Sequence, residues 1–264
     1  MKNYTFVLAI IFSGNIICSN QPPIISIITS IYKGKNFIEN FMKDITQQTI
    51  FEKCELILIS GNSPDKLYEE KIINQYIEKF PNMIYIYLRK DPGLYGVWNL
   101  GIALAKGKYI ANANIDDRLA HHAYEVLLST LEQNPEIDLV YADGIFTQDI
   151  DHTFYTCNRS HATNKPEFSK KAMQSCLPGN HPMWRKSLHN KYGYFDESFL
   201  IGGDWEFWLR VVEKDTQFKK VPQILGTFYL NPNGLSTSNR PEKGPEVKRI
   251  YSRYQYLWEN DNPC

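Results

Sequence analysis

The sequence predicts an α/β protein with three layers, in which helices cover both faces of a mostly parallel central sheet. From Ile24 to about Gly144, short runs rich in β-branched residues alternate with helical patterns, which is the order that parallel strands and crossover helices produce. The chain has 264 residues, of which 43% are apolar and 22% charged. That composition supplies a large core and differs from that of disordered chains. We therefore expect one domain over residues 21–264.

The first half yields five strands with helices between them. The strands are expected at residues 24–29, 55–59, 83–88, 108–113 and 137–141. Apolar residues at helical spacing predict helices at residues 37–45, 67–77, 94–105 and 123–131. In the second of these helices, Leu67 is among the residues expected to be buried. The turn Asp91-Pro92-Gly93 separates the third strand from its helix.

The alternation ends after Gly144, where the sequence becomes polar, aromatic and loop-like up to about Pro178. Order returns at residues 184–189 and at 204–213, where Phe207, Trp208, Val211 and Val212 suit a packed helix. Residues 241–258 are rich in tyrosine and predict a covering helix.

The charge balance excludes some function classes. Lys and Arg number 29, as do Asp and Glu, so the formal net charge is zero. A neutral chain has no broad field to grip a polyanion, and a nucleic-acid partner is therefore not expected. The five cysteines are widely spaced without a C-x-x-C pair, which argues against a zinc ribbon or a redox dithiol.

The N-terminus resembles a targeting segment. Lys2 precedes an uncharged stretch over residues 4–18, which is shorter than the ~20 apolar residues of a membrane-spanning helix. We interpret residues 1–20 as a signal peptide or a short membrane anchor, with a buried N-terminal segment as the alternative. Membrane association through residues 4–18 and a secretory or membrane-associated location follow, and the cytoplasmic face of a membrane is an option for an anchored form.

Polar residues follow the predicted strands at residues 30–33, 60–65, 91–99 and 114–117. In an open parallel sheet, ligands bind beyond the carboxyl ends of the strands. Asp116 and Asp117 directly follow a strand, and two adjacent carboxylates are a hard-oxygen site for Mn²⁺ or Mg²⁺. The alternative is that Asp117 caps the next helix.

Asp204 opens a helical stretch directly after Gly202-Gly203, with Glu206 two positions later. A carboxylate held at such a bend can act as a general base on a hydroxyl. The alternative is a helix-start acid that interacts with the helix dipole. His181 and Arg185 could donate hydrogen bonds to a diphosphate. Asn99 is unfavourable inside a helix unless its amide is used.

Several of these segments occur in the order and spacing of a known family. They include residues 55–65 (ELILISGNSPD), 98–102 (WNLGI), 114–117 (NIDD) and 203–210 (GDWEFWLR). From about Ile24 to Tyr229, the chain resembles the family 2 glycosyltransferases, which are inverting enzymes of the GT-A fold. The resemblance implies a nucleotide-binding half over about 24–144 and an acceptor half over about 145–264.

The resemblance also implies roles for individual residues. Asp117, with Asp116 beside it, would bind Mn²⁺ or Mg²⁺ at the donor diphosphate, and Asp204 would deprotonate the acceptor hydroxyl. His181, Arg185 and Glu206 are candidates for phosphate or acceptor contacts. The expected donor-binding residues are Ser30, Ile31, Tyr32, Ser60, Ser63, Asp65, Asp91, Asn99 and Asp116.

The sequence departs from the family pattern at the donor side. Ser60 and Gly61 replace paired aspartates, Asn114 replaces the first metal-motif Asp, and Trp98 replaces a common Arg. The Gln-x-x-Arg-Trp segment of processive synthases is absent near the end of the sequence, which indicates single additions.

The sequence therefore predicts a metal-dependent inverting glycosyltransferase. It would move one sugar from a nucleotide-sugar donor to a glycan, lipid-linked or protein acceptor in glycan, lipopolysaccharide-like or glycoconjugate synthesis. The alternative is a degenerate GT-A domain that acts as a secreted carbohydrate-binding or interaction protein. A sugar nucleotidyltransferase is a minor third option, because residues 30–35 contain only one glycine.

Overall fold

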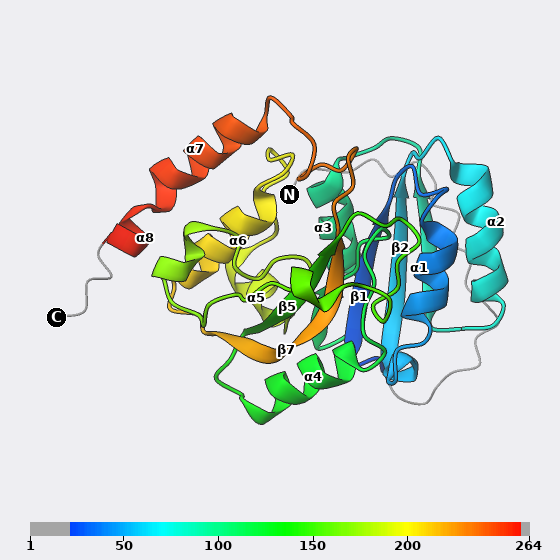
Figure 1. Ribbon diagram of the computed structural model, residues 1–264, viewed down its shortest axis with the longest axis horizontal. Coiled ribbons are helices and arrows are strands. Elements are labelled where there is room, and N and C mark those ends of the chain that lie inside the picture. Colours follow the sequence, from blue (N-terminus) through cyan, green and yellow to red (C-terminus); the bar gives the residue numbers. More distant parts are fainter. Residues whose placement is uncertain (1–21, 260–264) are drawn as a thin grey trace.

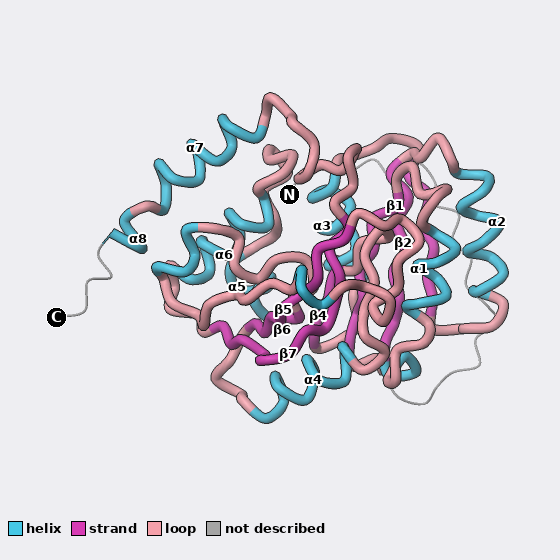
Figure 2. The backbone as a smooth tube through the Cα atoms, viewed as in Figure 1, coloured by secondary structure: helices cyan, strands magenta, loops and turns pink. Residues whose placement is uncertain are grey.

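A seven-stranded sheet in the order β3-β2-β1-β4-β6-β5-β7 forms the centre of the computed structural model (Figures 1 and 2), which describes residues 22–259. The strands are β1 (Ile25–Ile31), β2 (Cys54–Gly61), β3 (Met83–Leu88), β4 (Tyr109–Asn112), β5 (Leu139–Thr147), β6 (Met183–Arg185) and β7 (Phe218–Tyr229). The helices are α1 (Ile38–Ile45), α2 (Lys66–Ile77), α3 (Leu94–Leu104), α4 (Ala123–Gln133), α5 (Ser187–Tyr192), α6 (Gly203–Val212), α7 (Lys243–Tyr254) and α8 (Tyr256–Glu259).

Helices cover both faces of this sheet, because its buried strands present apolar side chains on both sides. Ile27 and Leu56 belong to one core, together with residues of α1, α2 and α4, whereas their neighbours Ile28 and Ile57 belong to a second core with residues of α3, α5 and α6. α7 and α8 lie at the opposite end of the molecule from α2 (Figure 1). The predicted three-layer α/β architecture is confirmed.

One reversed strand sets the geometry of the sheet edge. All hydrogen-bonded neighbours run parallel except β6, which is antiparallel to both β4 and β5. Because β4 and β5 are both antiparallel to β6, they run parallel to each other. The carboxyl ends of β1, β2, β3, β4, β5 and β7 therefore lie at one edge of the sheet. The segment that enters β6 reaches this edge as well, since Met183 at the start of β6 pairs with Ala111 near the end of β4.

The five predicted strands are present, and the structure adds β6 and β7. The fifth strand continues to Thr147, well beyond the predicted end at Tyr141. β7 was missed because Lys219, Lys220 and Pro222 interrupt its apolar pattern. Such residues are tolerated because β7 is the last strand of the sheet. The outer edge of β7 pairs with residues 118–120 around Gly226, which lies beyond the two lysines and the proline.

The prediction for Leu67 was wrong, since its side chain is 82% exposed. Leu67 lies in the first turn of α2 and faces solvent, whereas Ile73 of the same helix is fully buried.

The predicted signal peptide or anchor at residues 1–20 lies outside the described residues, and so do Cys18 and Cys264. Among residues 22–259, no helix combines the length and apolarity that crossing a bilayer requires. The cysteines in this range, Cys54, Cys157 and Cys176, form no disulfide.

Candidate active site

A cavity of about 650 Å³ opens at the edge of the sheet where β4, β5 and β7 end. Its lining includes Asn112 at the end of β4, Asn114 just after β4, Asp143 of β5, Thr227 of β7 and Asp204 of α6. These residues are distant in the sequence, and the sheet brings them together. The cavity therefore lies beyond the carboxyl ends of the strands, where open α/β sheets bind ligands.

Asp204 is the second residue of α6 and points its carboxylate into this cavity. Its Oδ1 accepts a hydrogen bond from the Tyr95 hydroxyl at 3.1 Å, and its Oδ2 accepts one from the Cys176 thiol at 3.5 Å. A Cβ atom at Gly203 would lie 2.7 Å from the Tyr95 ring, so only glycine lets α3 and the start of α6 approach this closely. The tyrosine and the carboxylate are thus fixed relative to one another.

The segment that leads into α6 is held by α7. The Glu246 carboxylate accepts hydrogen bonds from the backbone N–H groups of Leu200, Ile201 and Gly202 at 2.5, 2.9 and 2.9 Å. Three donors on one carboxylate define the path of the chain just before Asp204.

Burial raises the pKa of Asp204 above its usual value, and the hydrogen bonds from Tyr95 and Cys176 oppose that rise. A carboxylate with a raised pKa is a stronger base than a solvated one. Because it also faces a cavity, it can accept a proton from a bound hydroxyl.

Asp116 and Asp117 lie in the turn after β4, and their carboxylates have different partners. The Asp117 side chain is 4% exposed. Its Oδ2 accepts hydrogen bonds from the amides of Asn114 and Asn180 at 3.0 and 2.8 Å, and its Oδ1 accepts one from the backbone of Tyr229 at 2.8 Å. Asp116 accepts one side-chain hydrogen bond, from Asn231 at 3.0 Å. The Asp116 carboxylate therefore accepts fewer hydrogen bonds than that of Asp117 and has more capacity to bind a ligand.

The two carboxylates fit a divalent cation. Burial raises the pKa of Asp117 to about 6, and burial together with the nearby charge of Asp117 raises that of Asp116 to about 6. A bound cation would offset this crowded negative charge. Within residues 22–259, no cluster of three or more His, Cys, Asp and Glu side chains could hold a metal. Two carboxylates completed by ligand phosphates are a typical Mg²⁺ arrangement.

His181 lies at the cavity because it precedes the reversed strand β6. Its Nε2 donates to the carbonyl of Thr227 at 2.8 Å, so Nδ1 carries the lone pair, and this buried nitrogen has no partner among the described residues. Burial lowers the pKa of His181 to about 4. With Nε2 bonded to Thr227 and Nδ1 buried and unprotonated, the neutral imidazole has no N–H left to donate to a diphosphate, which the sequence suggested.

The prediction of a phosphate contact for Arg185 was wrong. Arg185 ends β6 and pairs with Tyr109 at the start of β4, so it lies at the opposite edge of the sheet from His181. Its guanidinium donates to the carbonyls of Ile137 at 2.7 Å and Leu131 at 2.9 Å. It stabilises the C-terminal end of α4, where a cation is favoured.

This assignment predicts the effect of Arg185→Ala. Loss of charge-assisted hydrogen bonds to buried carbonyls should lower the free energy of unfolding by about 2–3 kcal/mol. Urea unfolding would show a lower midpoint with an unchanged slope, and nucleotide-sugar affinity should not change. Arg89→Ala, which removes an exposed arginine, is the matched control. A loss of donor affinity without a loss of stability would restore the phosphate assignment.

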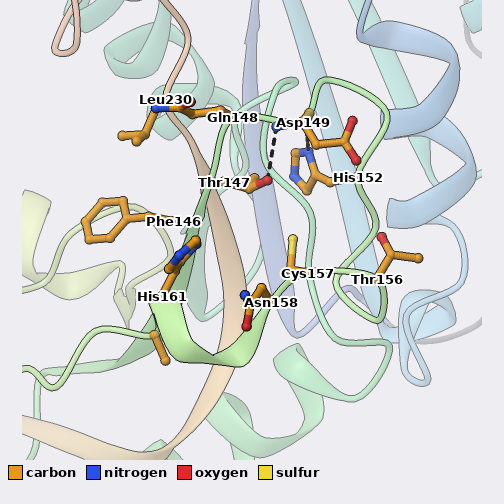
Figure 3. A pocket seen from close by; sticks show the side chains of 11 residues that line it. Phe146, Thr147, Gln148, Asp149, His152, Thr156, Cys157, Asn158, His161 and Leu230 are labelled. Atoms are coloured by element: carbon orange, nitrogen blue, oxygen red, sulfur yellow. Dashed lines mark hydrogen bonds between the residues drawn. The ribbon is translucent and has the colours of Figure 1, made fainter.

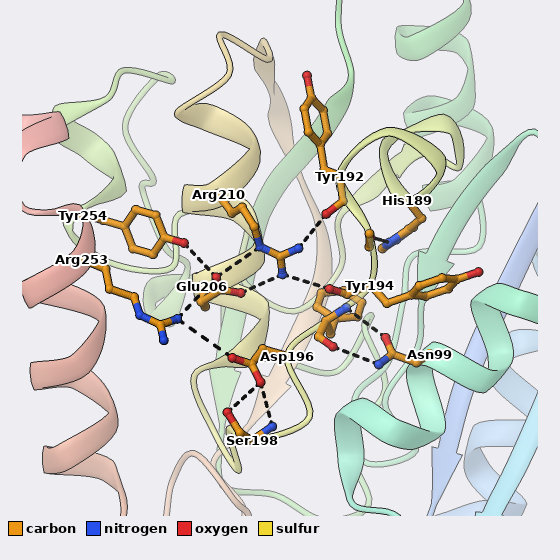
Figure 4. Close-up of polar contacts among 12 residues, drawn as sticks. Asn99, His189, Tyr192, Tyr194, Asp196, Ser198, Glu206, Arg210, Arg253 and Tyr254 are labelled. Atoms are coloured by element: carbon orange, nitrogen blue, oxygen red, sulfur yellow. Dashed lines mark hydrogen bonds and ion pairs between the residues drawn. The ribbon is translucent and has the colours of Figure 1, made fainter. Parts of the chain in front are cut away.

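Glu206 and Asn99 also bond to other parts of the fold and do not line the cavity, contrary to prediction (Figure 4). Glu206 is 3% exposed, pairs with Arg210 at 2.8 Å and accepts a hydrogen bond from Tyr254 of α7 at 2.8 Å. Two positions along a helix turn a side chain by ~200°, so Glu206 faces away from the cavity that Asp204 faces. The Asn99 amide exchanges two hydrogen bonds of 3.0 Å with the backbone of Phe195.

The predicted donor residues at the ends of β1 and β2 are adjacent, since Ile31 pairs with Ser60. Both side chains are 0% exposed, which rules out side-chain contacts with a donor at these two positions. Tyr32 is 48% exposed and Ser30 is partly exposed. None of these four lines the 650 Å³ cavity.

Ser63 and Asp65 hold the loop after β1. Ser63 Oγ and Asp65 Oδ2 accept hydrogen bonds from the backbones of Lys33 and Lys35, at 3.0 and 3.3 Å. Ser63 also donates to the buried Glu69 at 2.8 Å. Asp91 is exposed and accepts a hydrogen bond from the backbone of Gly93 at 2.8 Å. The roles of Ser30, Tyr32, Ser63, Asp65 and Asp91 toward a donor stay predictions.

A second cavity, of about 910 Å³, lies beside the loop that follows β5 (Figure 3). Phe146 lines both cavities, and Thr147, Asn158 and His161 line the second. His152 is tied into its wall, with ring nitrogens 2.6 Å from the carbonyl of Asp149 and 2.8 Å from Thr227 Oγ1. None of the predicted site residues lines this cavity.

Tyr95, Lys165 and Cys176 are among the residues of the active-site cavity that sequence reasoning missed. Tyr95 belongs to an apolar helix, where the sequence pattern predicts a core residue. Lys165 and Cys176 lie in the loop-like stretch after β5, where no periodicity indicates which side chains face inward. No sequence signal could have placed them, because their position depends on the path of that loop.

Comparisons with known proteins show the family of the chain. The sequence profile of glycosyl transferase family 2 matches residues 26–196. The chain is 24% identical over 241 residues to an uncharacterized glycosyltransferase of Methanocaldococcus jannaschii, covering 90% of this chain and 80% of that protein. It is 26% identical to the uncharacterized glycosyltransferase EpsJ of Bacillus subtilis, covering 88% and 68%. It is 33% identical to the minor teichoic acid biosynthesis protein GgaB of B. subtilis over 47% of this chain, which spans only 14% of GgaB.

Solved structures share the fold. TarS (residues 1–349) of S. aureus in complex with UDP-GlcNAc superposes with a TM-score of 0.70 at 15% identity, covering 87% of this chain and 66% of the TarS chain. The mannosyltransferase PcManGT of Pyrobaculum calidifontis, in complex with GDP-Man and Mn²⁺, superposes with a TM-score of 0.60 at 13% identity, covering 90% and 73%. With most of its length matched by the family profile and its sheet matched by these structures, the chain belongs to glycosyl transferase family 2 and is a glycosyltransferase.

Proposed function

We propose that the protein transfers a single sugar from a nucleotide-sugar donor to an acceptor hydroxyl, with inversion at the anomeric carbon and with a divalent metal at the donor. The observation that carries this proposal is the position of Asp204. Its carboxylate has a raised pKa and shares one cavity with Asn114 of the turn that contains Asp116 and Asp117. A base and a donor-binding turn that face one cavity suit a single displacement.

Asp204 would accept the proton of the acceptor hydroxyl as that oxygen attacks the anomeric carbon. The hydrogen bond from Tyr95 orients the carboxylate, and Gly203 permits this contact. The carboxylate must be ionised before it can accept a proton, so activity should rise with pH through the raised pKa of Asp204.

Asp116 and Asp117 would hold Mn²⁺ or Mg²⁺, with Asp116 as the principal ligand because both oxygens of Asp117 already accept hydrogen bonds. The cation would offset the negative charge on the departing nucleoside diphosphate. The Mn²⁺ and GDP-Man bound to PcManGT support this proposal for a protein of the same fold.

The proposed acceptor is a hydroxyl of a glycan, lipid-linked or protein acceptor in glycan or glycoconjugate synthesis. The alternative of a degenerate, secreted carbohydrate-binding domain gains no support from the comparisons, in which relatives over most of the chain are named glycosyltransferases.

Purified protein incubated with UDP-, GDP-, CMP- and dTDP-sugars tests the proposal. We expect at least one donor to be hydrolysed or transferred in the presence of Mn²⁺ or Mg²⁺. Removal of the metal with EDTA should lower this rate at least about tenfold, and added metal should restore it. The anomeric configuration of the product, measured by NMR, should be inverted. Turnover that is unaffected by EDTA would remove the metal from the proposal, and retained configuration would remove the single displacement.

A further inference from the structure

The ammonium group of Lys165 lies in the active-site cavity without a carboxylate partner. Its Nζ donates to the carbonyl of Pro178 at 2.9 Å. Among the described residues, no Asp or Glu lies within ion-pair distance of this nitrogen. An ammonium group has three donors, and besides this carbonyl the Lys165 nitrogen faces the Tyr141 ring at 5.9 Å from its centroid, which leaves donor capacity for a ligand.

Asp143, which lines the same cavity, is occupied by other groups. Its Oδ1 accepts hydrogen bonds from the backbone of Lys165 at 2.7 Å and from Thr163 at 2.8 Å. Its Oδ2 pairs with Lys220 at 3.0 Å. Asp143 thus anchors the backbone of Lys165 to β5 while a different lysine neutralises its charge.

The surroundings of the ammonium are closely packed. A Cβ atom at Gly179 would lie 2.5 Å from Lys165 Nζ, so the ammonium packs directly against the backbone of Gly179, whose φ of +67° favours glycine. Burial lowers the pKa of Lys165 to about 8. The charge of Asp143 opposes this lowering without forming an ion pair with Lys165. A desolvated cation without an ion-pair partner is unfavourable, and a bound anion would relieve that cost.

Lys165 lines the same cavity as Asp204, the proposed base. Cys176, whose thiol contacts the Asp204 carboxylate at 3.5 Å, is among the groups that act electrostatically on Lys165. His181, which lies 3.8 Å from Asp117, feels the charges of both Lys165 and Asp116. Lys165 is therefore within electrostatic range both of Cys176, beside the base, and of His181, beside the turn that would bind the donor diphosphate.

We propose that Lys165 binds a carboxylate or phosphate group of the acceptor, so that the acceptor is an acidic saccharide, such as a uronic acid glycoside or a sugar or polyol phosphate. This inference rests on the proposed function of the same cavity. The donor diphosphate is a second source of the same anionic chemistry, and the experiment separates the two.

Saturation-transfer NMR with three probes tests the proposal. The probes are p-nitrophenyl glucuronide, p-nitrophenyl glucoside as its neutral counterpart, and glycerol 3-phosphate. The full-length protein should bind the glucuronide or glycerol 3-phosphate about tenfold more tightly than the glucoside, as a charge-assisted hydrogen bond provides. Lys165→Met should abolish this preference, and Lys165→Arg should retain most of it. Lys219→Met, which removes an exposed lysine of β7 whose ammonium bonds to Asn134, is the matched control and should change nothing.

Affinity for UDP and for GDP with Mn²⁺, measured on the same variants by calorimetry, distinguishes the donor from the acceptor. The proposal expects little change in Lys165→Met. Weaker nucleotide binding with an unchanged preference among the three probes would overturn it in favour of the diphosphate. A wild-type protein that does not prefer an acidic probe would also overturn it. Thermal unfolding of each variant shows whether it is folded, and Lys165→Gln replaces Lys165→Met if that variant is not. Because binding is measured without turnover, the absence of sugar transfer would count against the proposed function alone.

Discussion

Asp204→Asn is expected to lower the rate of sugar transfer by about 10²–10⁴-fold, because asparagine cannot accept the proton of the acceptor hydroxyl. The affinity for the nucleotide sugar should stay within about twofold of wild type, since the donor is expected at the turn after β4. Transfer kinetics together with calorimetry of donor binding measure both quantities on one preparation. Full activity of the variant would exclude Asp204 as the base.

The same substitution should not destabilise the protein, and this separates catalysis from folding. The pKa of Asp204 is raised from 3.8 in the folded state. Ionisation of this carboxyl therefore opposes folding, increasingly so as the pH rises from about 3.8 through the raised pKa. Asparagine does not ionise, and its NH₂ group can donate to the Tyr95 hydroxyl or the Cys176 sulfur, each of which can accept as well as donate. At neutral pH the Tm of the variant should therefore equal or exceed that of wild type. A lower Tm would indicate that the carboxylate is structural.

Tyr95→Phe provides the matched control for this interpretation. It retains the carboxylate but removes a hydrogen bond that lowers the pKa of Asp204. The acid limb of the pH–rate profile should therefore move to higher pH, while the rate on the plateau changes less than in Asp204→Asn. An unshifted acid limb would show that another group limits the rate at low pH.

Asp116→Asn is expected to weaken Mn²⁺-dependent binding of the nucleotide donor at least about tenfold and to lower transfer by about 10²-fold or more, because a charged oxygen ligand is lost. Calorimetric titration of Mn²⁺ in the presence of UDP or GDP measures the first effect. Unchanged metal dependence would remove Asp116 from the metal site.

Asp117→Asn should behave differently, although it makes the same chemical change one residue away. Both oxygens of Asp117 accept hydrogen bonds, and an asparagine would place an NH₂ group against one of these donors. We expect its free energy of unfolding to fall by about 1–3 kcal/mol, whereas Asp116→Asn should be close to wild type in stability. Equal stability of the two variants would contradict the different roles that we assign to these carboxylates.

The alternating half of the fold could be predicted from sequence because its strands are buried on both faces. Ile25 to Ile31 and Cys54 to Gly61 are almost continuously apolar or β-branched, and such runs leave few alternatives. β7 breaks this pattern with two lysines and a proline. It could not be recognised, since an edge strand is stabilised by a neighbour that lies distant in the sequence.

The site could be predicted only where the role of a residue depends on its position at the end of a strand or the start of a helix. Asp116 and Asp204 follow or begin regular elements, and the structure places them where the sequence suggested. Arg185 and Glu206 are also near predicted elements, but their roles depend on the direction of β6 and on the angular position around α6. Local sequence does not reveal strand direction, and so Arg185 was misassigned. Glu206 was misassigned because it lies on the opposite side of α6 from Asp204.

The three hydrogen bonds from Glu246 to the chain before α6 bear on which part of the molecule is the smallest unit able to catalyse transfer. The family profile ends at residue 196, yet Asp204 lies beyond it and its approach is held by α7. α7 contributes no reacting group, but it determines where the base is presented. A shortened protein that stops before α7 would contain every residue that we assign to catalysis and still lack a defined catalytic geometry.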